Sequence, residues 1–246
     1  MKVISLFSGA GGMDIGFEEA GFEIVVAVEQ DSACCDTLRV NRPNLKVIEQ
    51  DISTVKTSYI LQEANLKPLE AALVIGGPPC QSFSLAGKRM GLNDKRGMLL
   101  LEFVRVVREA LPIAFVMENV QGMMNWENGK AIQAVLNEFK EPITYLENQY
   151  QYEIGYQVLN AADYGVAQFR ERLFIVGNRL NKGFLFPQPT HSSKESSGLL
   201  DIFGHQKMSY KTTWDAIGSL PPANEPSDTA KRVSQTIKAR IEKHGY

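Results

Sequence analysis

The first twenty residues restrict the fold classes open to this chain. A β-rich run at 2–7 is followed by a glycine-rich turn at 8–12 and a helical pattern at 13–20. A strand, a glycine turn and a helix open a nucleotide-binding βαβ unit, because glycines let the backbone approach a ligand at the helix N-terminus. The next predicted strand, 23–28, ends at Glu29, where an acid can bind ribose hydroxyls.

This opening pattern fits either a dinucleotide or S-adenosylmethionine. The dinucleotide fingerprint is Gly-x-Gly-x-x-Gly, and counted from Gly9 its sixth position is Asp14. The fingerprint is broken where its third glycine should stand, which disfavours a nicotinamide oxidoreductase. S-adenosylmethionine has no pyrophosphate for such a turn to cradle.

Apolar, β-branched runs of strand length recur along the chain and alternate with helical patterns. This alternation predicts one large α/β domain, and 246 residues are enough for its core. Further strands are predicted at 46–48, 73–75, 113–117, 152–159 and 173–177. One helix is predicted to follow residues 96–99 and to end at 110, and another to span 129–139. The polar stretch 191–209, which contains serine and glycine, is predicted to be a loop.

One cysteine directly follows a predicted buried strand. Two glycines and two prolines, 76–79, stop the run 73–75 and present Cys80 just past the strand end, where open α/β sheets bind ligands. The prolines fix φ and stiffen the approach, which suits a nucleophile that must be held in place. A cysteine is more often a small buried hydrophobe, but the polar neighbours Gln81 and Ser82 argue against burial. We therefore expect Cys80 to be a reactive thiol.

The net charge restricts how the chain meets nucleic acid. A net charge of −2 is unlike that of an autonomous DNA-binding domain, so DNA contacts must come from local basic segments. Two basic segments follow motifs, which favours phosphate contact over a role as solvated surface charge. They contain Lys88, Arg89, Lys95 and Arg96, and Arg170, Arg172, Arg179 and Lys182.

Other patterns exclude several classes of protein. Three cysteines, two of them adjacent, give neither a disulfide framework nor metal-ligand spacing, and the histidines are scattered, so we expect no metal. No apolar segment is long enough to span a membrane, and the N-terminus lacks the organisation of a signal peptide. We expect a cytoplasmic protein that is not attached to a membrane.

Four spaced motifs resemble those of the cytosine-C5 DNA methyltransferases. GGPPCQSFS (76–84) is similar to their catalytic loop, and FSGAGG (7–12) to their cofactor motif. Glu-Asn-Val (118–120) and Gln-x-Arg-x-Arg (168–172) resemble two further motifs of the active site. The resemblance continues more thinly through FPQPTH (186–191) and WDAIGSLP (214–221). It implies a Rossmann-like methyltransferase fold with a mostly parallel, doubly wound sheet.

The resemblance also implies transfer of a methyl group from S-adenosylmethionine to C5 of cytosine in double-stranded DNA. The implied catalytic residues are Cys80, which attacks C6 of a flipped cytosine, Glu118, which bonds the base, and Arg170 and Arg172. The implied cofactor-binding residues are Phe7, Gly9, Ala10, Gly11, Gly12, Glu29, Gln30, Asp51, Ile52, Pro78 and Leu99. The implied DNA-binding residues are Gln81, Ser82, Ser84, Lys88, Arg89, Arg96 and Gln168. Alternatively, Phe7 and Leu99 are core residues and Asp51 is a helix N-cap.

The resemblance ends near Pro221, which predicts a catalytic, cofactor-binding domain (1–222) and a helical extension (223–246). Family members normally continue into a target-recognition region that this sequence lacks. The chain therefore resembles the larger, catalytic subunit of a split bacterial enzyme of a restriction-modification system, with a second polypeptide as its partner. The extension has an apolar helical face, formed by Val233, Ile237 and Ile241, which either docks that partner or packs on the chain's own core.

Two other functions stay open. A non-catalytic nucleic-acid-binding module derived from this family would be expected to lose at least one of Cys80, Glu118, Arg170 and Arg172, and all four are present. The other alternative is an RNA cytosine methyltransferase of the same family.

Overall fold

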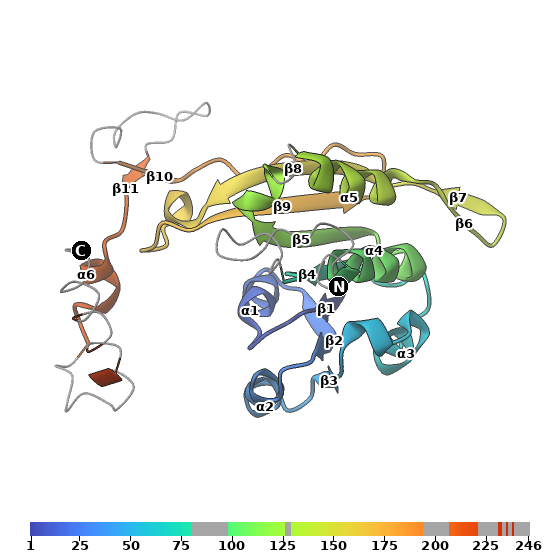
Figure 1. Cartoon of the computed structure of the whole chain (residues 1–246), viewed down its shortest axis with the longest axis horizontal. Helices are drawn as coiled ribbons and strands as arrows, with labels where there is room; N and C mark the ends of the chain where they lie inside the picture. The colour runs from blue at the N-terminus through green and yellow to red at the C-terminus, as the bar shows by residue number, and fades with distance from the viewer. Residues whose placement is uncertain are drawn as a thin grey trace.

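The computed structural model describes residues 1–79, 98–125, 129–193 and 207–220, together with residues 231, 232, 235 and 238. Seven strands form its central sheet (Figure 1). The strands are β1 (Lys2–Leu6), β2 (Glu23–Glu29), β3 (Lys46–Glu49), β4 (Leu73–Gly76), β5 (Ala114–Val120), β8 (Glu153–Asn160) and β9 (Glu171–Asn178). Their order across the sheet is β3-β2-β1-β4-β5-β9-β8.

The sheet has a parallel part and an antiparallel part. β1 pairs in parallel with β2 and β4, and the parallel pairing continues outward to β3 and β5. β9 is antiparallel to both of its neighbours, β5 and β8. The chain builds outward from β1 to β3 and then returns to place β4 on the other side of β1, so the strand order reverses there. The predicted mostly parallel α/β sheet is confirmed, and ligands bind such sheets beyond the carboxyl strand ends at the reversal.

Helices cover both faces of the sheet, so the fold is doubly wound (Figure 1). One face packs against α3 (Thr57–Glu63), α4 (Met98–Ala110) and α5 (Lys130–Lys140). The opposite face packs against α1 (Gly12–Glu19), and α2 (Ser32–Asn41) lies beside the start of α1. α4 ends at its predicted residue, and its apolar side chains at 100, 103, 104 and 107 form one buried stripe.

An aromatic cluster joins the parallel and antiparallel parts of the sheet. Phe115 of β5 stacks on Phe139 of α5 with 4.2 Å between ring centroids, and Phe103 of α4 meets Phe115 edge-on. Gly177 of β9 lies against the Phe115 ring so closely that a Cβ there would collide with it. Tyr152 completes the cluster, donates its hydroxyl to a backbone carbonyl at 2.8 Å, and has a pKa raised by burial. This packing fixes β9 beside β5.

The predicted loop at 191–209 is wrong at its two ends. These ends form β10 (His191–Ser192) and β11 (Met208–Ser209), which pair in parallel. Both flanks bind Asp163, whose backbone carbonyl accepts from Thr190 N at 2.9 Å and whose carboxylate accepts from the Tyr210 hydroxyl at 2.7 Å. A shared partner far away in the sequence therefore pairs two segments that carry no strand pattern of their own.

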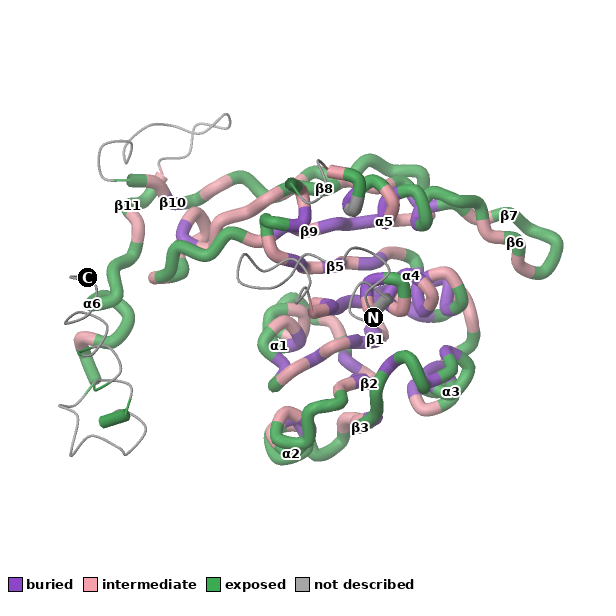
Figure 2. Tube along the Cα trace, in the orientation of Figure 1, coloured by how far each residue is buried: buried purple, intermediate pink, exposed green. Residues whose placement is uncertain are grey.

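The remaining elements are short. They are η1 (Ile52–Thr54), η3 (Gln121–Met124), η5 (Ala161–Tyr164), the hairpin β6 (Ile143–Tyr145) and β7 (Asn148–Tyr150), and α6 (Thr213–Ile217). Figure 2 shows that burial concentrates on the central strands and the helix sides that face them, whereas α6 is exposed. Residues 231, 232, 235 and 238 are helical and exposed, but Val233, Ile237 and Ile241 lie outside the described residues. Within the described ranges, no helix is long and apolar enough to cross a membrane.

Candidate active site

A cavity of about 210 Å³ opens beyond the carboxyl ends of β1 to β4, where the strand order reverses. Its wall brings together many of the residues predicted to bind a cofactor. These are Phe7, Glu29, Gln30, Asp51, Ile52 and Leu99. The sequence missed Val28, Gln50, Gly77 and Pro79. Each of these four directly precedes or follows a predicted cofactor residue, and that adjacency is the signal that could have found them.

Glu29 holds the glycine turn against the end of β2. One carboxylate oxygen, Oε2, accepts from the Gly9 N–H at 2.8 Å. The other, Oε1, accepts from the N–H groups of Gln30 and Asp31 at 2.8 and 2.9 Å. A carboxylate has about four acceptor positions, so Glu29 retains capacity for a ligand in the cavity that it lines. Its fixed orientation comes from these three main-chain donors.

None of the residues of the glycine turn, 8–12, lines the cavity, so the cofactor contact expected of Gly9 stays a prediction. Gly11 is buried with φ of 86°, and a Cβ there would lie 2.7 Å from Arg42 Nη1 and 2.9 Å from Leu38, so its glycine is required by packing against α2. Ala10 and Gly12 are exposed and do not line the cavity. The cofactor contacts expected of these three residues stay predictions.

Two apolar residues serve both the core and the cavity. Phe7 and Leu99 are partly buried, pack against the large hydrophobic core and also line the cavity. Phe7 adopts φ of 53°, a left-handed conformation that costs a non-glycine residue of order 1–3 kcal/mol. The core alternative and the cavity position are therefore not exclusive.

Asp51 begins the η1 turn at the edge of the same cavity. Its Oδ1 accepts from the Ser53 N–H at 2.9 Å and from the Ser53 hydroxyl at 2.8 Å. The N-cap alternative is thus confirmed, and Asp51 lines the cavity as well. The next residue, Ile52, is buried and also contributes to the wall.

A second cavity, of about 340 Å³, lies beside β5 and β9 and is mostly apolar. Its wall contains one carboxylate, that of Glu118, and two guanidinium groups, those of Arg170 and Arg172. Arg172 Nε lies 2.8 Å from Glu118 Oε1, and Arg170 Nη2 lies 4.0 Å from the same oxygen. The predicted strand 113–117 stops too early, because β9 keeps pairing with β5 through Val120 and Glu118 therefore lies inside the strand. The wall consists of Met13, Glu118, Leu159, Ala161, Tyr164, Arg170, Arg172, Phe174 and Pro187.

The two cavities meet at Gly77. This residue lines the first cavity, and a Cβ added to it would lie 3.2 Å from Glu118 Oε2 in the second. The following segment is fixed by Asn119, whose side-chain amide donates to the Pro78 carbonyl at 3.1 Å. Pro78 itself is buried. Asn119, which the sequence did not single out, therefore holds the backbone just before Cys80.

Several predicted residues lie outside the described part of the chain. They are Cys80, Gln81, Ser82, Ser84, Lys88, Arg89, Lys95 and Arg96. The chain reaches this segment from Pro79, which lines the first cavity, and leaves it at α4. Gln168 is described and exposed, two residues before Arg170.

The second predicted basic segment is not one cluster. Arg179 and Lys182 follow the far end of β9, whereas Arg170 and Arg172 lie at its start, and a strand rises about 3.3 Å per residue. Arg179 donates to three backbone carbonyls, those of residues 69, 111 and 112, at 3.1 to 3.3 Å. Its interpretation as a phosphate contact beside Arg170 and Arg172 is therefore wrong.

The two cysteines in the described part of the chain, Cys34 and Cys35, line neither cavity. Burial raises the pKa of Cys35 to about 11, and burial also raises the pKa of Cys34, so both stay protonated thiols at neutral pH. Within the described residues, no group of three or more His, Cys, Asp and Glu side chains is placed to hold a metal ion.

The chain matches proteins of one family throughout its length. The family model for C-5 cytosine-specific DNA methylases matches residues 1–244. Type II methyltransferase M.AquIA of Picosynechococcus is 63% identical over 245 residues, which cover 100% of this chain and 99% of the relative. Type II methyltransferase M.FnuDI of Fusobacterium nucleatum is 40% identical over 232 residues, which cover 93% of this chain but only 59% of the relative.

Solved structures agree with the sequence matches. A protein described as a DNA modification methyltransferase encoded within an E. coli prophage has a TM-score of 0.68 and 30% identity, over 91% of this chain and 56% of that one. DNMT2 of Spodoptera frugiperda has a TM-score of 0.56 and 25% identity, over 76% of this chain and 52% of that one. The family match spans both cavities, and the chain therefore belongs to the C-5 cytosine-specific DNA methylases.

Proposed function

We propose that the chain transfers a methyl group from S-adenosylmethionine to C5 of cytosine in double-stranded DNA, as part of a type II modification enzyme. The observation that carries this proposal is the meeting of the two cavities at Gly77. The donor and acceptor atoms must approach to about 3–3.5 Å for the transfer, so the sites that bind them must lie directly beside each other. Membership of the methylase family supports the same reaction.

The first cavity is assigned to the methyl donor. An aromatic ring at Phe7, a carboxylate at Glu29 and an acid at Asp51 suit an adenosine, whose ring stacks and whose hydroxyls donate. When bound, S-adenosylmethionine supplies an electrophilic methyl group. Glu29 would orient the ribose, and Asp51 and Ile52 would contact the adenine.

Cys80 is assigned as the nucleophile. Its thiolate would form a bond from Sγ to C6 of a cytosine flipped out of the duplex, and the displaced π electrons would make C5 nucleophilic. C5 would then take the methyl group, and the donor would leave as S-adenosylhomocysteine. Loss of the C5 proton to solvent would restore the C5–C6 double bond and break the bond to sulfur, which releases the thiolate.

Glu118 and its two arginines are assigned to the flipped base. Glu118 Oε1 faces Arg172, whereas Oε2 lies near Gly77, which lines the first cavity. Glu118 would bond N3 and the exocyclic amine of the base and stabilise charge that develops on the ring. Arg172 would assist from the O2 side. Arg170, about half exposed, suits the nearby DNA phosphate.

We further propose that residues 1–222 act as the catalytic domain and that a second polypeptide supplies target recognition. The lengths of the relatives support this, because M.AquIA matches over almost its whole length and M.FnuDI extends well beyond the matched part. Base flipping costs a few kcal/mol, which groove contacts must offset. Exposed apolar side chains on and after α6, at Trp214, Ile217 and Leu220, suit a docking surface, as does the apolar face predicted within residues 223–246.

The test is incubation with labelled S-adenosylmethionine and duplex DNA, with and without host extract, followed by analysis of the nucleosides. We expect label in 5-methylcytosine only when the extract supplies the second polypeptide. Label without extract would overturn the two-chain part alone. Label in RNA and not in DNA, or in neither with extract present, would overturn the DNA methyltransferase assignment.

A further inference from the structure

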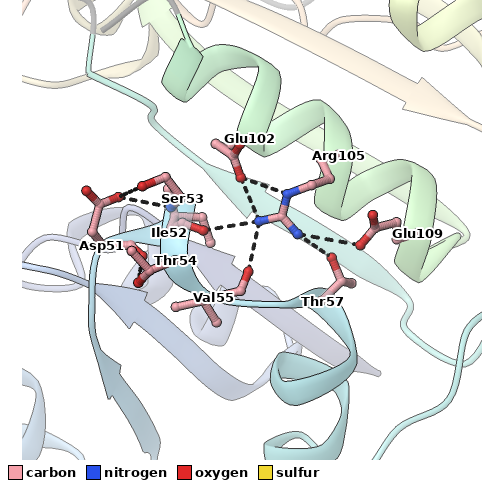
Figure 3. Close-up of polar contacts among 9 residues, drawn as sticks. All are labelled: Asp51, Ile52, Ser53, Thr54, Val55, Thr57, Glu102, Arg105 and Glu109. Atoms are coloured by element: carbon pink, nitrogen blue, oxygen red, sulfur yellow. Dashed lines mark hydrogen bonds and ion pairs between the residues drawn. The ribbon is translucent and has the colours of Figure 1, made fainter. Parts of the chain in front are cut away.

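One arginine outside both cavities holds the turn that forms the end of the first. Arg105 lies on α4 and reaches across to the segment after β3 (Figure 3). Its Nη2 donates to the backbone carbonyls of Ile52 and Val55 at 3.1 and 2.9 Å, and its Nη1 donates to the Thr57 hydroxyl at 2.8 Å. Three acceptors within six residues therefore converge on one guanidinium.

Two carboxylates on the same helix fix the direction of that guanidinium. Glu102, one turn before Arg105, binds its Nε and Nη2, each at 2.7 Å. Glu109, one turn after it, lies 3.5 Å from Nη1. The Arg105 side chain is only 27% exposed, so these pairs are partly shielded from water. The arginine is thus aimed at the turn by its own helix before any ligand binds.

The segment that Arg105 holds separates it from the first cavity. Ile52 contributes its side chain to the cavity wall and its carbonyl to Arg105. Asp51 lines the cavity and starts the same turn, with only Oδ1 engaged by Ser53 (Figure 3). Loss of the arginine would free two main-chain carbonyls, and the turn would shift to satisfy them. Any such shift moves Asp51 and Ile52.

We propose that Arg105 is a positioning residue for the methyl-donor site, which acts by holding Asp51 and Ile52 where the adenine end of the donor binds. The inference rests on the proposed function, because it assumes that the first cavity takes S-adenosylmethionine. Arg105 itself is not one of the described residues that line the first cavity.

The experiment compares Arg105→Met with Arg108→Met in the full chain. Arg108 is a matched control, since it lies on the same helix and its Nη1 also donates to two carbonyls, those of Glu138 and Glu141, at 2.7 and 2.9 Å, near the end of α5. Calorimetry with S-adenosylmethionine should show about tenfold weaker binding for Arg105→Met, the size expected for lost hydrogen bonds that orient a contact. Arg108→Met should change the affinity for S-adenosylmethionine less than about twofold, even if both variants melt at a lower temperature than the wild type.

Two further measurements separate positioning from a general loss of stability. 5′-Methylthioadenosine, which lacks the amino-acid end, should lose affinity by a similar factor, because the turn addresses the adenine. In a double-mutant cycle, Arg105→Met with Asp51→Ala should bind no more weakly than the worse single variant, since both act through the same turn. Thr57→Val, a smaller change, replaces Arg105→Met if the latter does not fold, with a loss of about threefold expected.

The measurements distinguish a wrong methyl-donor assignment from a wrong role for Arg105. If the wild-type chain binds no S-adenosylmethionine, the proposed function fails. If the wild type binds and the Arg105 and Arg108 variants bind equally well, or if the effects of Arg105→Met and Asp51→Ala multiply, the positioning role of Arg105 fails alone.

Discussion

The two cavities are built differently, although they meet at Gly77. In the parallel part, the first cavity is formed by the residues at strand ends and by main-chain groups, as when Glu29 binds three N–H groups. In the antiparallel part, the charged pair of the second cavity comes from within paired strands, where Glu118 of β5 meets Arg172 of β9. The first depends on local chain conformation, and the second depends on the register of two distant segments.

This difference predicts that substitutions on the two sides separate binding from chemistry. Glu118→Gln should lower the rate of methyl transfer about a hundredfold, because it removes general acid catalysis at the base. The affinity for S-adenosylmethionine should stay within about twofold of the wild type. Single-turnover kinetics with the partner present, beside calorimetry, measure both. An unchanged rate would mean that Glu118 is structural.

Gly77 is the point at which the two sides should fail together. Gly77→Val would place side-chain atoms within about 3.2 Å of Glu118 Oε2 and at the wall of the first cavity. We expect a loss of rate of some tens of fold and a loss of donor affinity of several fold, since misplacement near 1 Å is costly. Gly16→Ala is the control, because a Cβ there meets nothing within 4 Å. If both variants behave alike, the cavities do not share this wall.

Glu29 should report on the first cavity alone. Glu29→Ala should weaken S-adenosylmethionine binding by about 1.5–3 kcal/mol, through a lost charged hydrogen bond and a loosened Gly9 turn. Once the donor is saturating, the rate of transfer should recover to near the wild-type value. Glu23→Ala, at the exposed start of β2, provides the control. Tight NAD binding with none of S-adenosylmethionine would contradict the identity of the donor.

The smallest effect concerns Asp14, which lies beneath the glycine turn. Burial, opposed by the 2.6 Å hydrogen bond from Ser5, raises the pKa of Asp14, and its Oδ2 has no hydrogen-bond partner among the described residues. Because the folded state binds this proton more tightly than the unfolded chain, stability falls as pH rises from the unfolded pKa through the folded one.

Asp14→Asn removes the buried charge and should become more stable relative to the wild type as pH rises from about 4 to 7, by about 1 kcal/mol. Urea unfolding at the two pH values measures this change. The same substitution at Asp36, which is exposed on α2, should give no such trend. If the difference in stability between Asp14→Asn and the wild type does not change with pH, the pKa of Asp14 is not raised in the folded protein.

Features set by local sequence were predictable, whereas contacts between distant segments were not. Strand ends, the glycine turn and the position of Glu29 follow from local patterns, so most of the first cavity was predictable. Glu118 and Arg172 were identified as site residues only through a family resemblance, and their contact was not predicted, because it depends on a register set across some fifty residues. Arg179 was interpreted from the sequence as a phosphate contact and Arg105 was given no role, yet both bind backbone carbonyls from other segments.

In the proposed reaction, Cys80 attacks the cytosine held in the second cavity. The most direct measurement uses duplex DNA containing 5-fluorocytosine, S-adenosylmethionine and host extract. Fluorine cannot leave C5 as the proton does, so the bond from sulfur to C6 should persist. Mass spectrometry should find a DNA adduct on the Cys80 peptide of the wild type and none in Cys80→Ser, whose donor affinity should be unchanged. Methylated DNA with no adduct, or an adduct on Cys34 or Cys35, would contradict the account.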